Sequence, residues 1–388
     1  MRKTLAALLL AAAAGHAAEV APGQSFSVDP NALPPPGATP SAGNPPEIVA
    51  RPQGAGLLVP SGYRATLFAE GLSHARNLLV APDGTVIVAE QHADKLTLLS
   101  DTNGDGRADR RATIDGFSQP FGLALAGDEL WVADTKAVWR LHWPDGARRV
   151  QVTARGALGD AHGHSTRNLA LAPDRSRFFV AIGSAHNVAE EAPPRATIQE
   201  FAIDGSGQRT LAAGLRNPVG LAIRPGTDEL WTVVNERDGL GDELVPDYLT
   251  RVHDGGFYGW PYAYLGGHPQ PGLAAQAPAK VKATLMPDLL FRSHSAPLGL
   301  AFWHGDAFVA LHGSWNRSDP VGYLVARVPF KDGRPLGWYE AFATGFALPA
   351  GKGQARVWGR PVGLAVGPDD ALYVADDSGQ TVWRIVRE

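Results

Sequence analysis

The sequence predicts an all-β protein built as a six-bladed β-propeller. Six times along the chain, a small or polar residue, a leucine and a small apolar residue are followed by a turn and a strand of bulky residues. A repeat of roughly 40–50 residues is typical of propeller blades, each of which is a four-stranded sheet. Residues 59–388 leave room for six blades of about 50–55 residues each. The leucines of the six phrases are Leu78, Leu123, Leu169, Leu221, Leu300 and Leu364.

Within the expected blades, apolar and polar residues alternate, as in strands with one buried face. Residues 130–134 read Leu-Trp-Val-Ala-Asp and are followed by a second such run at 137–141. The turn between two runs is marked by Pro-Asp-Gly at 82–84. These patterns favour antiparallel strands joined by short turns.

The two ends of the repeat region predict how the ring closes. A propeller leaves no free edge when its first strand joins its last blade. We therefore expect the strand at residues 62–69 to pair with the strand at 381–386. The interval between Leu221 and Leu300 is too long for one blade, so we expect long loops over residues 236–292, where function commonly resides.

The first 18 residues are expected to be a signal peptide. Arg2 and Lys3 precede an apolar stretch over residues 5–14, and small residues stand at the −3 and −1 positions of a cleavage site ending at Ala17. An uncleaved membrane anchor is the alternative. No later segment is apolar enough to span a bilayer, so we expect a periplasmic protein without stable membrane insertion of the mature chain.

The rest of the chain divides by composition. Residues 19–58 are rich in Pro, Gly and Ala and are expected to form an extended tail or linker. Residues 59–388 are expected to form the six-bladed catalytic propeller. Its central opening at one end, called the mouth below, is where loops of all blades meet.

Charge and cysteine content limit the partners and the chemistry. The net charge of −4 and the isoelectric point near 6.3 argue against nucleic acid as a partner. The sequence has no cysteine, which excludes disulfides, a thiolate nucleophile and a cysteine-ligated metal. A haem-attachment motif also needs cysteine, so electrons from a redox reaction would leave to a separate carrier, such as a cytochrome or the quinone pool.

A histidine pair stands directly before one blade. Residues 160–168 read Asp-Ala-His-Gly-His-Ser-Thr-Arg-Asn. A histidine at the mouth can act as a general base because its pKa lies near working pH. Two alternatives stay open: turn hydrogen bonds made by two loop histidines, and a metal site built on His162 and His164.

Arginines stand before or after several blade strands. Arg216 begins an Arg-Asn-Pro turn before the fourth blade, and its planar cation suits carboxylates and quinone oxygens. A surface turn is the alternative. Together with Arg317 and Arg360, it would make the mouth cationic although the whole chain is acidic. A cationic mouth points to an anionic ligand such as a polycarboxylate cofactor.

Two acidic loops are candidates for calcium, which prefers carboxylate and carbonyl oxygens. Residues 235–243 combine carboxylates with glycines; a solvated loop is the alternative. Residues 101–109 resemble a compact calcium loop, but the glutamate that closes an EF-hand is missing. An Asx-rich turn is the alternative there. The candidate ligands of a structural calcium are Asp101, Asn103, Asp105 and Asp109.

The order of several motifs resembles that of the soluble pyrroloquinoline quinone (PQQ)-dependent sugar dehydrogenases. The segment 312–317, His-Gly-Ser-Trp-Asn-Arg, is similar to one in the branch named for L-sorbosone dehydrogenase. The resemblance spans about residues 60–388 and implies a six-bladed propeller, PQQ and Ca²⁺ as cofactors, and a sugar or aldehyde substrate. Its motifs are His164, Arg216-Asn217-Pro218, Glu236, Asp242-Glu243 and the segment from Gly255-Gly256 to Tyr258-Gly259-Trp260-Pro261.

The resemblance also implies roles for single residues. His164 would take the proton of the substrate hydroxyl, and Arg216 would contact quinone oxygens and stabilise developing negative charge. The backbone carbonyls of Asp238 and Gly239 would hold Ca²⁺ on the quinone, although Arg237-Asp238-Gly239 stands where the family usually has Gly-Pro. The remaining residues expected at the cofactor are Gln119, Asn217, Asn316, Arg317 and Arg360.

Taken together, the sequence predicts a PQQ-dependent dehydrogenase that oxidises an aldose or a sorbosone-like aldehyde by base-assisted hydride transfer to the quinone. A calcium-dependent propeller lactonase is one rival, but it needs carboxylates and asparagines converging on one ion, and the mouth is richer in Arg and His. A non-catalytic binding or scaffold propeller is the other, because a fold alone does not fix a function.

Overall fold

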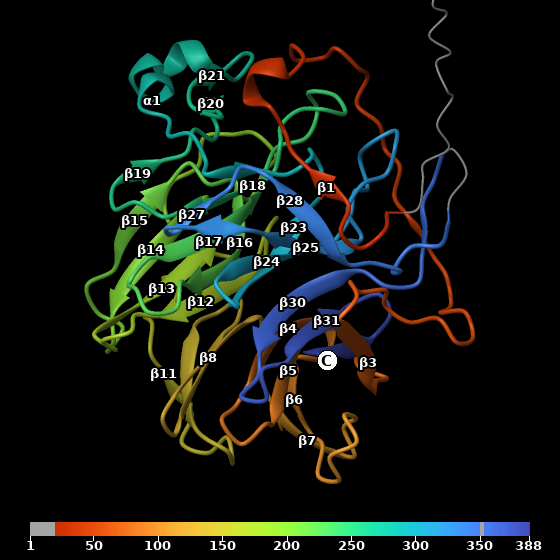
Figure 1. Cartoon of the computed structure of the whole chain (residues 1–388). Coiled ribbons are helices and arrows are strands. Elements are labelled where there is room, and N and C mark those ends of the chain that lie inside the picture. The colour runs from red at the N-terminus through yellow and green to blue at the C-terminus, as the bar shows by residue number, and fades with distance from the viewer. Residues whose placement is uncertain (1–19, 350–352) are drawn as a thin grey trace, which may run out of the picture.

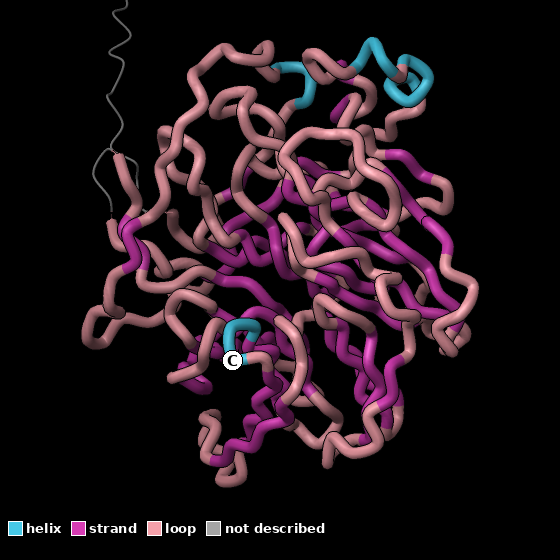
Figure 2. Tube along the Cα trace, turned by 180° about the vertical axis from the view of Figure 1, so that it is seen from behind, coloured by secondary structure: helices cyan, strands magenta, loops and turns pink. Residues whose placement is uncertain are grey.

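The computed structural model describes residues 20–349 and 353–388. The expected signal peptide, residues 1–18, lies outside this range. Strands dominate the described chain, and helices are confined to short pieces (Figure 2). No helix within the described residues is long and apolar enough to cross a bilayer.

Six antiparallel sheets form the ring, which confirms the predicted six-bladed β-propeller (Figure 1). In each sheet the strand that carries the repeated phrase is innermost, and each inner strand contacts the next around the ring. The first three blades are β4 (Ala75–Val80), β5 (Val86–Glu90), β6 (Lys95–Ser100) and β7 (Arg110–Asp115); β8 (Gly122–Ala126), β9 (Glu129–Ala133), β10 (Val138–His142) and β11 (Val150–Gln151); and β12 (Arg167–Leu171), β13 (Arg177–Ile182), β14 (Thr197–Ala202) and β15 (Arg209–Ala213).

The other three blades follow the same order, and the last one closes the ring. β3 is the outer strand of blade six and pairs with the C-terminal strand, as predicted. In Figure 1, β3 lies beside the C-terminus. The strands are β16 (Asn217–Ile223), β17 (Leu230–Asn235), β18 (Tyr248–Arg251) and β22 (Leu289–Leu290); β23 (Pro297–Trp303), β24 (Asp306–Leu311), β25 (Leu324–Val328) and β28 (Tyr339–Ala343); and β30 (Pro361–Val366), β31 (Leu372–Asp376), β32 (Thr381–Arg387) and β3 (Tyr63–Glu70).

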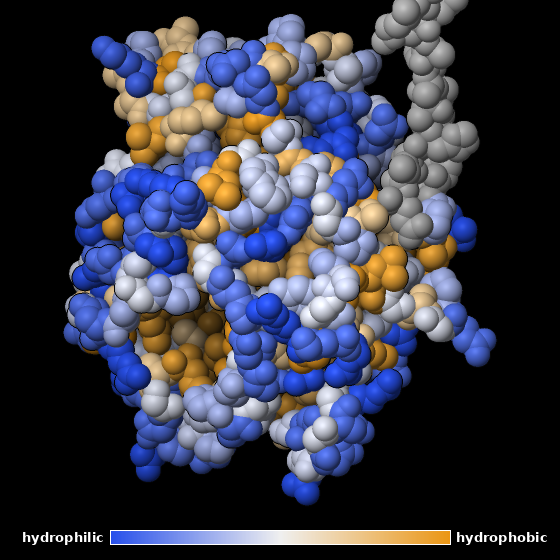
Figure 3. Space-filling model, viewed as in Figure 1, coloured by the Kyte–Doolittle hydropathy of each residue, from blue (hydrophilic) through white to orange (hydrophobic). Residues whose placement is uncertain are grey.

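Apolar residues fill the space between neighbouring blades. Each of six buried clusters joins one blade to the next, for example Trp131 of blade two with Phe178 of blade three, and Trp231 of blade four with Leu300 of blade five. Burying such side chains provides the main favourable free energy of folding. The face seen in Figure 3 is mostly hydrophilic, with apolar residues showing in small groups and in one hollow.

The repeated phrase fills the centre of the ring. Two residues before its leucine, Phe121, Val219, Leu298 and Val362 come together as a buried apolar plug. The next position is usually glycine because the inner strands approach closely there. A Cβ on Gly122 would lie 2.7 Å from the backbone oxygen of Arg167 in the neighbouring blade, a contact that needs the backbone to move.

Two blades have asparagine in place of that glycine. The side-chain amide of Asn168 donates to the carbonyl of Val219 at 2.8 Å, and that of Asn77 donates to the carbonyl of Phe121 at 2.9 Å. In these two blades the plug position holds Arg76 and Arg167. The repeated phrase therefore determines both the inner strands and the contacts between them at the centre of the ring.

Residues 20–58, expected as an extended linker, are extended but lie packed along the blades. Within them, β1 (Ser25–Phe26) pairs with β28, and β2 (Glu47–Ile48) pairs with β29 (Arg356–Val357). Phe26 and Leu33 pack against interblade cores. We call this segment the arm; it runs in red and orange in Figure 1.

The expected long loops lie between β18 and β22. Here β20 and β21 pair as a small hairpin, and with α1 they stand beyond the blades (Figure 1). The remaining short elements are β19 (Gly256–Phe257), β20 (Ala263–Tyr264), β21 (His268–Pro269), β26 (Phe330–Lys331), β27 (Arg334–Pro335), α1 (Pro278–Lys282) and the 3₁₀ turns η1 (Pro30–Ala32), η2 (Gln91–Ala93) and η3 (Ala274–Gln276).

Candidate active site

The mouth is the end of the channel where the inner strands begin. His164, Arg216 and Arg360 all precede inner strands there, since they stand just before β12, β16 and β30. The second strand of each blade runs antiparallel to the inner one and ends at the same place. The residues that directly follow β13, β17, β24 and β31 therefore also lie at the mouth, beside the residues that precede the inner strands.

His164 is held as a neutral imidazole with one free nitrogen. Its Nδ1 lies 2.8 Å from the carbonyl oxygen of Ser184, which can only accept, so Nδ1 carries the proton and donates. Burial and the charge of Arg216 lower the pKa of His164 to about 4. At neutral pH the Nε2 lone pair is therefore available to accept a proton, which is the state a general base needs.

Arg216 is buried beside His164 and fixed by three groups. Its guanidinium donates to the carbonyl of Glu236 at 2.8 Å, to the side-chain oxygen of Asn187 at 3.0 Å and to the carboxylate of Asp238 at 3.1 Å. Burial lowers the pKa of Arg216, but the group stays cationic at neutral pH. This places a fixed positive charge next to the base.

Asp238 joins the loop after β17 to the segment after β24. Its carboxylate also accepts from the side-chain amide of Asn316, and Asn316 lies 3.0 Å from the ring of His294. Burial alone would raise the pKa of Asp238, but its contact with His294 and the charge of Arg216 hold it below the usual value. Asp238 is thus an anion at neutral pH and balances Arg216.

Asn217 offers an acceptor without a donor. It begins β16 and is buried, and its Oδ1 has no hydrogen-bond partner among the described residues. A buried polar atom without a partner costs about 1–3 kcal/mol. An unpaired buried oxygen at the mouth fits a site whose ligand or water supplies the missing donor.

Arg317 and Gln119 differ from the other expected cofactor residues. The Arg317 guanidinium donates to the carbonyl of Asp319 in its own segment, and to the carbonyl of Asp242 and the carboxylate of Glu243 in the loop after Asp238. Gln119 is exposed, and its backbone amide donates to Asp94 at 2.7 Å. Its side chain makes no hydrogen bond within the described residues.

Arg360 belongs to a second cluster at the mouth. Its guanidinium donates to the carbonyls of His312 and Gly313 at 3.1 and 2.9 Å. Asp377 accepts from Arg76 at 2.7 Å and lies 3.0 Å from Nε2 of His312. Burial lowers the pKa of His312 to about 4, so Arg76 is the counter-charge of Asp377 at neutral pH.

The sequence analysis missed several residues of these clusters. Asn187, His294 and Asp377 stand in loops with no motif of their own, and nothing local marks them. Arg76 did carry a signal. It occupies the plug position of the repeated phrase, where four blades have an apolar residue, and a charged residue in an apolar repeat position indicates a special contact.

The two calcium predictions rest on loops that the structure holds by hydrogen bonds. The carbonyl of Asp238 accepts from Asn187 at 2.9 Å, and Gly239 is open, since a Cβ there would meet nothing within 4 Å. The described residues contain no group of three or more His, Asp or Glu side chains arranged to hold a metal ion. A calcium ion at this loop would be held by the backbone carbonyl oxygens of Asp238 and Gly239 and by oxygen atoms of the bound quinone. This site stays a prediction.

The loop 101–109 is organised as Asx turns. The carboxylate of Asp101 accepts from the amides of Gly104 and Gly106 at 2.7 and 2.8 Å, and that of Asp109 accepts from Thr102. Asn103 accepts from the amide of Asp105 at 2.9 Å. These hydrogen bonds are those of Asx turns, and a structural calcium at this loop stays a prediction.

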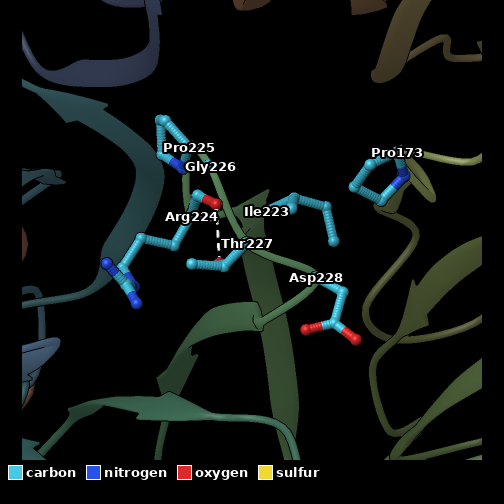
Figure 4. A pocket seen from close by; sticks show the side chains of 7 residues that line it. All are labelled: Pro173, Ile223, Arg224, Pro225, Gly226, Thr227 and Asp228. Carbon is cyan, nitrogen blue, oxygen red and sulfur yellow. Dashed lines mark hydrogen bonds between the residues drawn. The ribbon is translucent and has the colours of Figure 1, made fainter.

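A pocket at the other end of the inner strands lacks such chemistry. It lies between the turn that follows β12 and the turn that follows β16, and Pro173, Ile223 and Pro225 line it (Figure 4). Thr227 donates to the carbonyl of Arg224 at 2.8 Å, and Arg224 pairs with Glu229. Asp228 is the remaining charged residue of the lining, and no histidine stands beside it, so the mouth is the better candidate site.

The fold and the site define a six-bladed propeller with a half-buried imidazole and a buried guanidinium at its mouth. A family model described as TrAA12-like matches residues 57–254 and 277–388. The chain belongs to this family. The matched residues include both clusters at the mouth, but they leave out the arm before residue 57 and residues 255–276, where the Gly-Gly-x-Tyr-Gly-Trp-Pro motif lies.

This chain aligns with only a part of the length of two curated relatives. An uncharacterised protein of Borreliella burgdorferi is 29% identical over 252 residues, which are 62% of this chain and 65% of the relative. A PQQ-dependent pyranose dehydrogenase of Coprinopsis cinerea is 25% identical over an alignment 398 positions long, which covers 85% of this chain and 54% of the relative. The chain thus spans between about half and two thirds of the curated relatives it matches.

Solved structures share the fold. The holo PQQ domain of the Coprinopsis cinerea pyranose dehydrogenase superposes with a TM-score of 0.75 at 22% identity, covering 88% of this chain and 99% of that one. A calcium structure of a Trichoderma reesei AA12 protein gives 0.70 at 20%, covering 86% and 97%. The PQQ-bound aldose sugar dehydrogenase of Streptomyces coelicolor gives 0.60 at 17%, covering 84% and 100%.

Proposed function

We propose that the protein is a PQQ-dependent dehydrogenase that oxidises an aldose or a sugar-derived aldehyde of the sorbosone type. The observation that carries the proposal is His164, a half-buried neutral imidazole whose Nε2 makes no hydrogen bond within the described residues and which stands beside the buried cation Arg216. The descriptions of similar proteins support the proposal. Two of these proteins are named as PQQ-dependent or PQQ-bound dehydrogenases of pyranose or aldose sugars, and a third is described in a calcium structure.

The residues at the mouth fit such a cofactor. PQQ is a polyanion, and Arg216, Arg360 and Arg76 supply cations there. Asn217 has an unpaired acceptor. Asn217 and Asn316 would contact the cofactor edge, Arg360 its carboxylates, and the carbonyls of Asp238 and Gly239 would hold Ca²⁺. The side chain of Gln119 is exposed and makes no hydrogen bond within the described residues, so it could contact the cofactor, whereas Arg317 would have to give up contacts to Asp242, Glu243 or Asp319.

The chain's own residues suit the oxidation of a hydroxyl group. When bound, the quinone supplies a two-electron acceptor for the hydrogen on the substrate carbon. His164 Nε2 accepts the hydroxyl proton, and the carbonyl of Ser184 stabilises the imidazolium that forms. Arg216, held by Asp238 and Asn187, presents positive charge where negative charge develops.

The proposal extends to the cell. A leader of the signal-peptide type supports export to the periplasm, and the lack of cysteine supports electron transfer to a separate cytochrome or quinone carrier. The similarity of segment 312–317 to the L-sorbosone dehydrogenase branch supports a sorbosone-like aldehyde as substrate.

Reconstitution tests the proposed function. The purified protein is mixed with PQQ and Ca²⁺, and the spectrum of bound quinone and the reduction of a dye by aldoses and aldehydes are followed. We expect both a bound-quinone spectrum and dye reduction. Quinone binding without dye reduction would favour a scaffold, and lactone cleavage without quinone would favour the calcium-dependent lactonase.

A further inference from the structure

The arm crosses two loops that reach the candidate site. Residues 20–56 lie outside the family match. The arm is anchored on both sides of these loops, by β1 on β28 and by β2 on β29. Between the anchors, Val28 and Leu33 pack with Leu240 against the core of blades three and four.

The first contact of the arm is with the loop that follows Asp238. The amide of Gly37 donates to the carbonyl of Leu240 at 2.9 Å, and the amide of Asp242 donates to the hydroxyl of Thr39 at 2.8 Å. Gly241 has a φ of +104°, and a Cβ there would lie 2.8 Å from the carbonyl of Thr39. Only glycine permits this close approach.

The second contact is with the segment that follows Asn316. The side-chain amide of Asn44 donates to the carbonyls of Arg317 and Ser318, both at 3.1 Å. The backbone amide of Asn44 donates to the carbonyl of Trp315 at 2.7 Å. One half-buried asparagine of the arm thus makes three hydrogen bonds to residues that flank Asn316.

These contacts close a circuit. The amide of Ser318 donates to the carboxylate of Asp242 at 3.0 Å, and Arg317 donates to the carbonyl of the same residue. Thr39, Asp242, Ser318 and Asn44 therefore link the arm to both loops and the loops to each other. At the site itself, the two loops meet where Asn316 donates to Asp238.

A second segment outside the family match supports the same loop from the protein interior. The fully buried Arg237 donates to Gln270 at 3.0 Å and to the carbonyl of Ala263 at 2.8 Å. Both partners lie within residues 255–276, which the family model leaves out. The residue before Asp238 is thus held by one such segment and the residues after it by the other.

We infer that the arm is a strap, and that Thr39 and Asn44 are positioning residues that hold Asp238 and Asn316 in place for the metal and the quinone. The loop 238–243 contains Gly239 and Gly241, both at positive φ, and would lose much conformational freedom on ordering. Ordering it in advance leaves less to lose when a ligand binds. The part concerning metal and quinone rests on the proposed function.

Four variants of the full chain test the strap. Asn44→Ala removes the contacts to residues 317 and 318, and Thr39→Val removes the acceptor for Asp242. Thr39→Ser retains the hydroxyl, so it should behave as the wild type. Asn31→Ala is the matched control, because Asn31 lies in the same arm and, within the described residues, its side chain hydrogen-bonds Asp29 alone.

Two measurements separate the strap from the proposed function. Without cofactor, hydrogen exchange of the amides at 238–243 and 315–318 should be faster in Asn44→Ala and Thr39→Val than in Asn31→Ala. With cofactor, the Kd for PQQ in saturating Ca²⁺ should rise about 10–100-fold in the same two variants, the range for groups that orient ligands of a metal.

Each outcome is informative. Unchanged exchange in Asn44→Ala and Thr39→Val would overturn the strap. Faster exchange with an unchanged Kd would overturn its role at the site. Faster exchange in a protein whose wild type binds no PQQ would leave the strap standing and reject the proposed function. If Asn44→Ala does not fold, the comparison of Thr39→Val with Thr39→Ser still decides.

Discussion

The Nδ1 atom of His164 lies 2.8 Å from the carbonyl oxygen of Ser184, so Nδ1 carries the proton and Nε2 is left as the unprotonated nitrogen. The carbonyl fixes the tautomer because it can accept a hydrogen bond but cannot donate one. Ser184 follows β13 and His164 precedes β12, its partner in blade three. The blade itself thus sets the protonation pattern of the base.

Replacing His164 with alanine should nearly abolish turnover. Loss of a positioned base typically lowers the rate about 10²–10⁴-fold. The contacts proposed for Arg216 and Asn217 with the cofactor would remain, so the Kd for PQQ should change little. His162→Ala is the control, because His162 is exposed two residues away. Sugar oxidation by His164→Ala at the wild-type rate would remove the assigned role.

The pH dependence of kcat/KM should report a low pKa for the base. Burial and Arg216 lower the pKa of His164 from 6.5 to about 4, so the neutral form persists as the pH falls to about 4. A bound cation would lower the pKa further. We expect kcat/KM to be flat down to about pH 5 and to fall below that. A fall centred at pH 6.5 or above would contradict the buried environment described for His164.

The Arg216→Lys variant should lose most of its activity, although lysine keeps the positive charge. Lysine cannot reproduce the planar set of donors that bonds Glu236, Asn187 and Asp238 together. We expect kcat/KM to fall about 10²-fold or more, as for loss of a donor to developing charge. Stopped-flow reduction of the bound quinone would measure the step. If the bound quinone in Arg216→Lys were reduced at the wild-type rate, a positive charge alone would suffice at this position.

Gly122→Ala should destabilise the ring without touching the site. The added Cβ would lie 2.7 Å from the backbone of Arg167 and Leu169, and such overpacking costs about 1–3 kcal/mol. Urea unfolding would measure the free energy of unfolding. Gly43→Ala is the control, because its Cβ would meet nothing within 4 Å. Equal stabilities of the two variants would contradict the close approach of the inner strands.

Asp101→Ala should destabilise the loop 101–109 whether or not calcium is present. Asp101 accepts hydrogen bonds from the amides of Gly104 and Gly106, and each exposed bond contributes about 0.5–1.5 kcal/mol. The melting temperature should fall by the same amount in EDTA and in excess Ca²⁺. A fall seen only with Ca²⁺ would instead establish the structural ion that the loop pattern suggests.

Local sequence was sufficient to predict the blades. The repeated phrase, the alternation at 130–134 and the turn at 82–84 are short-range signals, and β3 pairs with β32 as the closure argument predicts. The motifs at His164 and Arg216 also fell at the mouth, because both stand directly before inner strands. The repeat shows where a residue stands within its blade, and that place determines at which end of the propeller the residue lies.

Local sequence was misleading where distant contacts decide. The arm looks like a linker because it is rich in Pro, Gly and Ala, yet Asn44 bonds residues 317 and 318, more than 270 positions away. Arg317 looks like a cofactor ligand by motif, yet its donors are used by Asp242, Glu243 and Asp319. Neither partner set has a periodic pattern that could reveal it.

By itself, the sequence determined the number of blades, the closure of the ring and the residue types available at the mouth, because these depend on a periodic pattern read within one blade. The tertiary structure alone decided which charges share that mouth, which partners each arginine has there and what the arm binds. Those choices depend on pairing between blades and on burial, which set the pKa of His164 and the partners of Asp238 and Asp377.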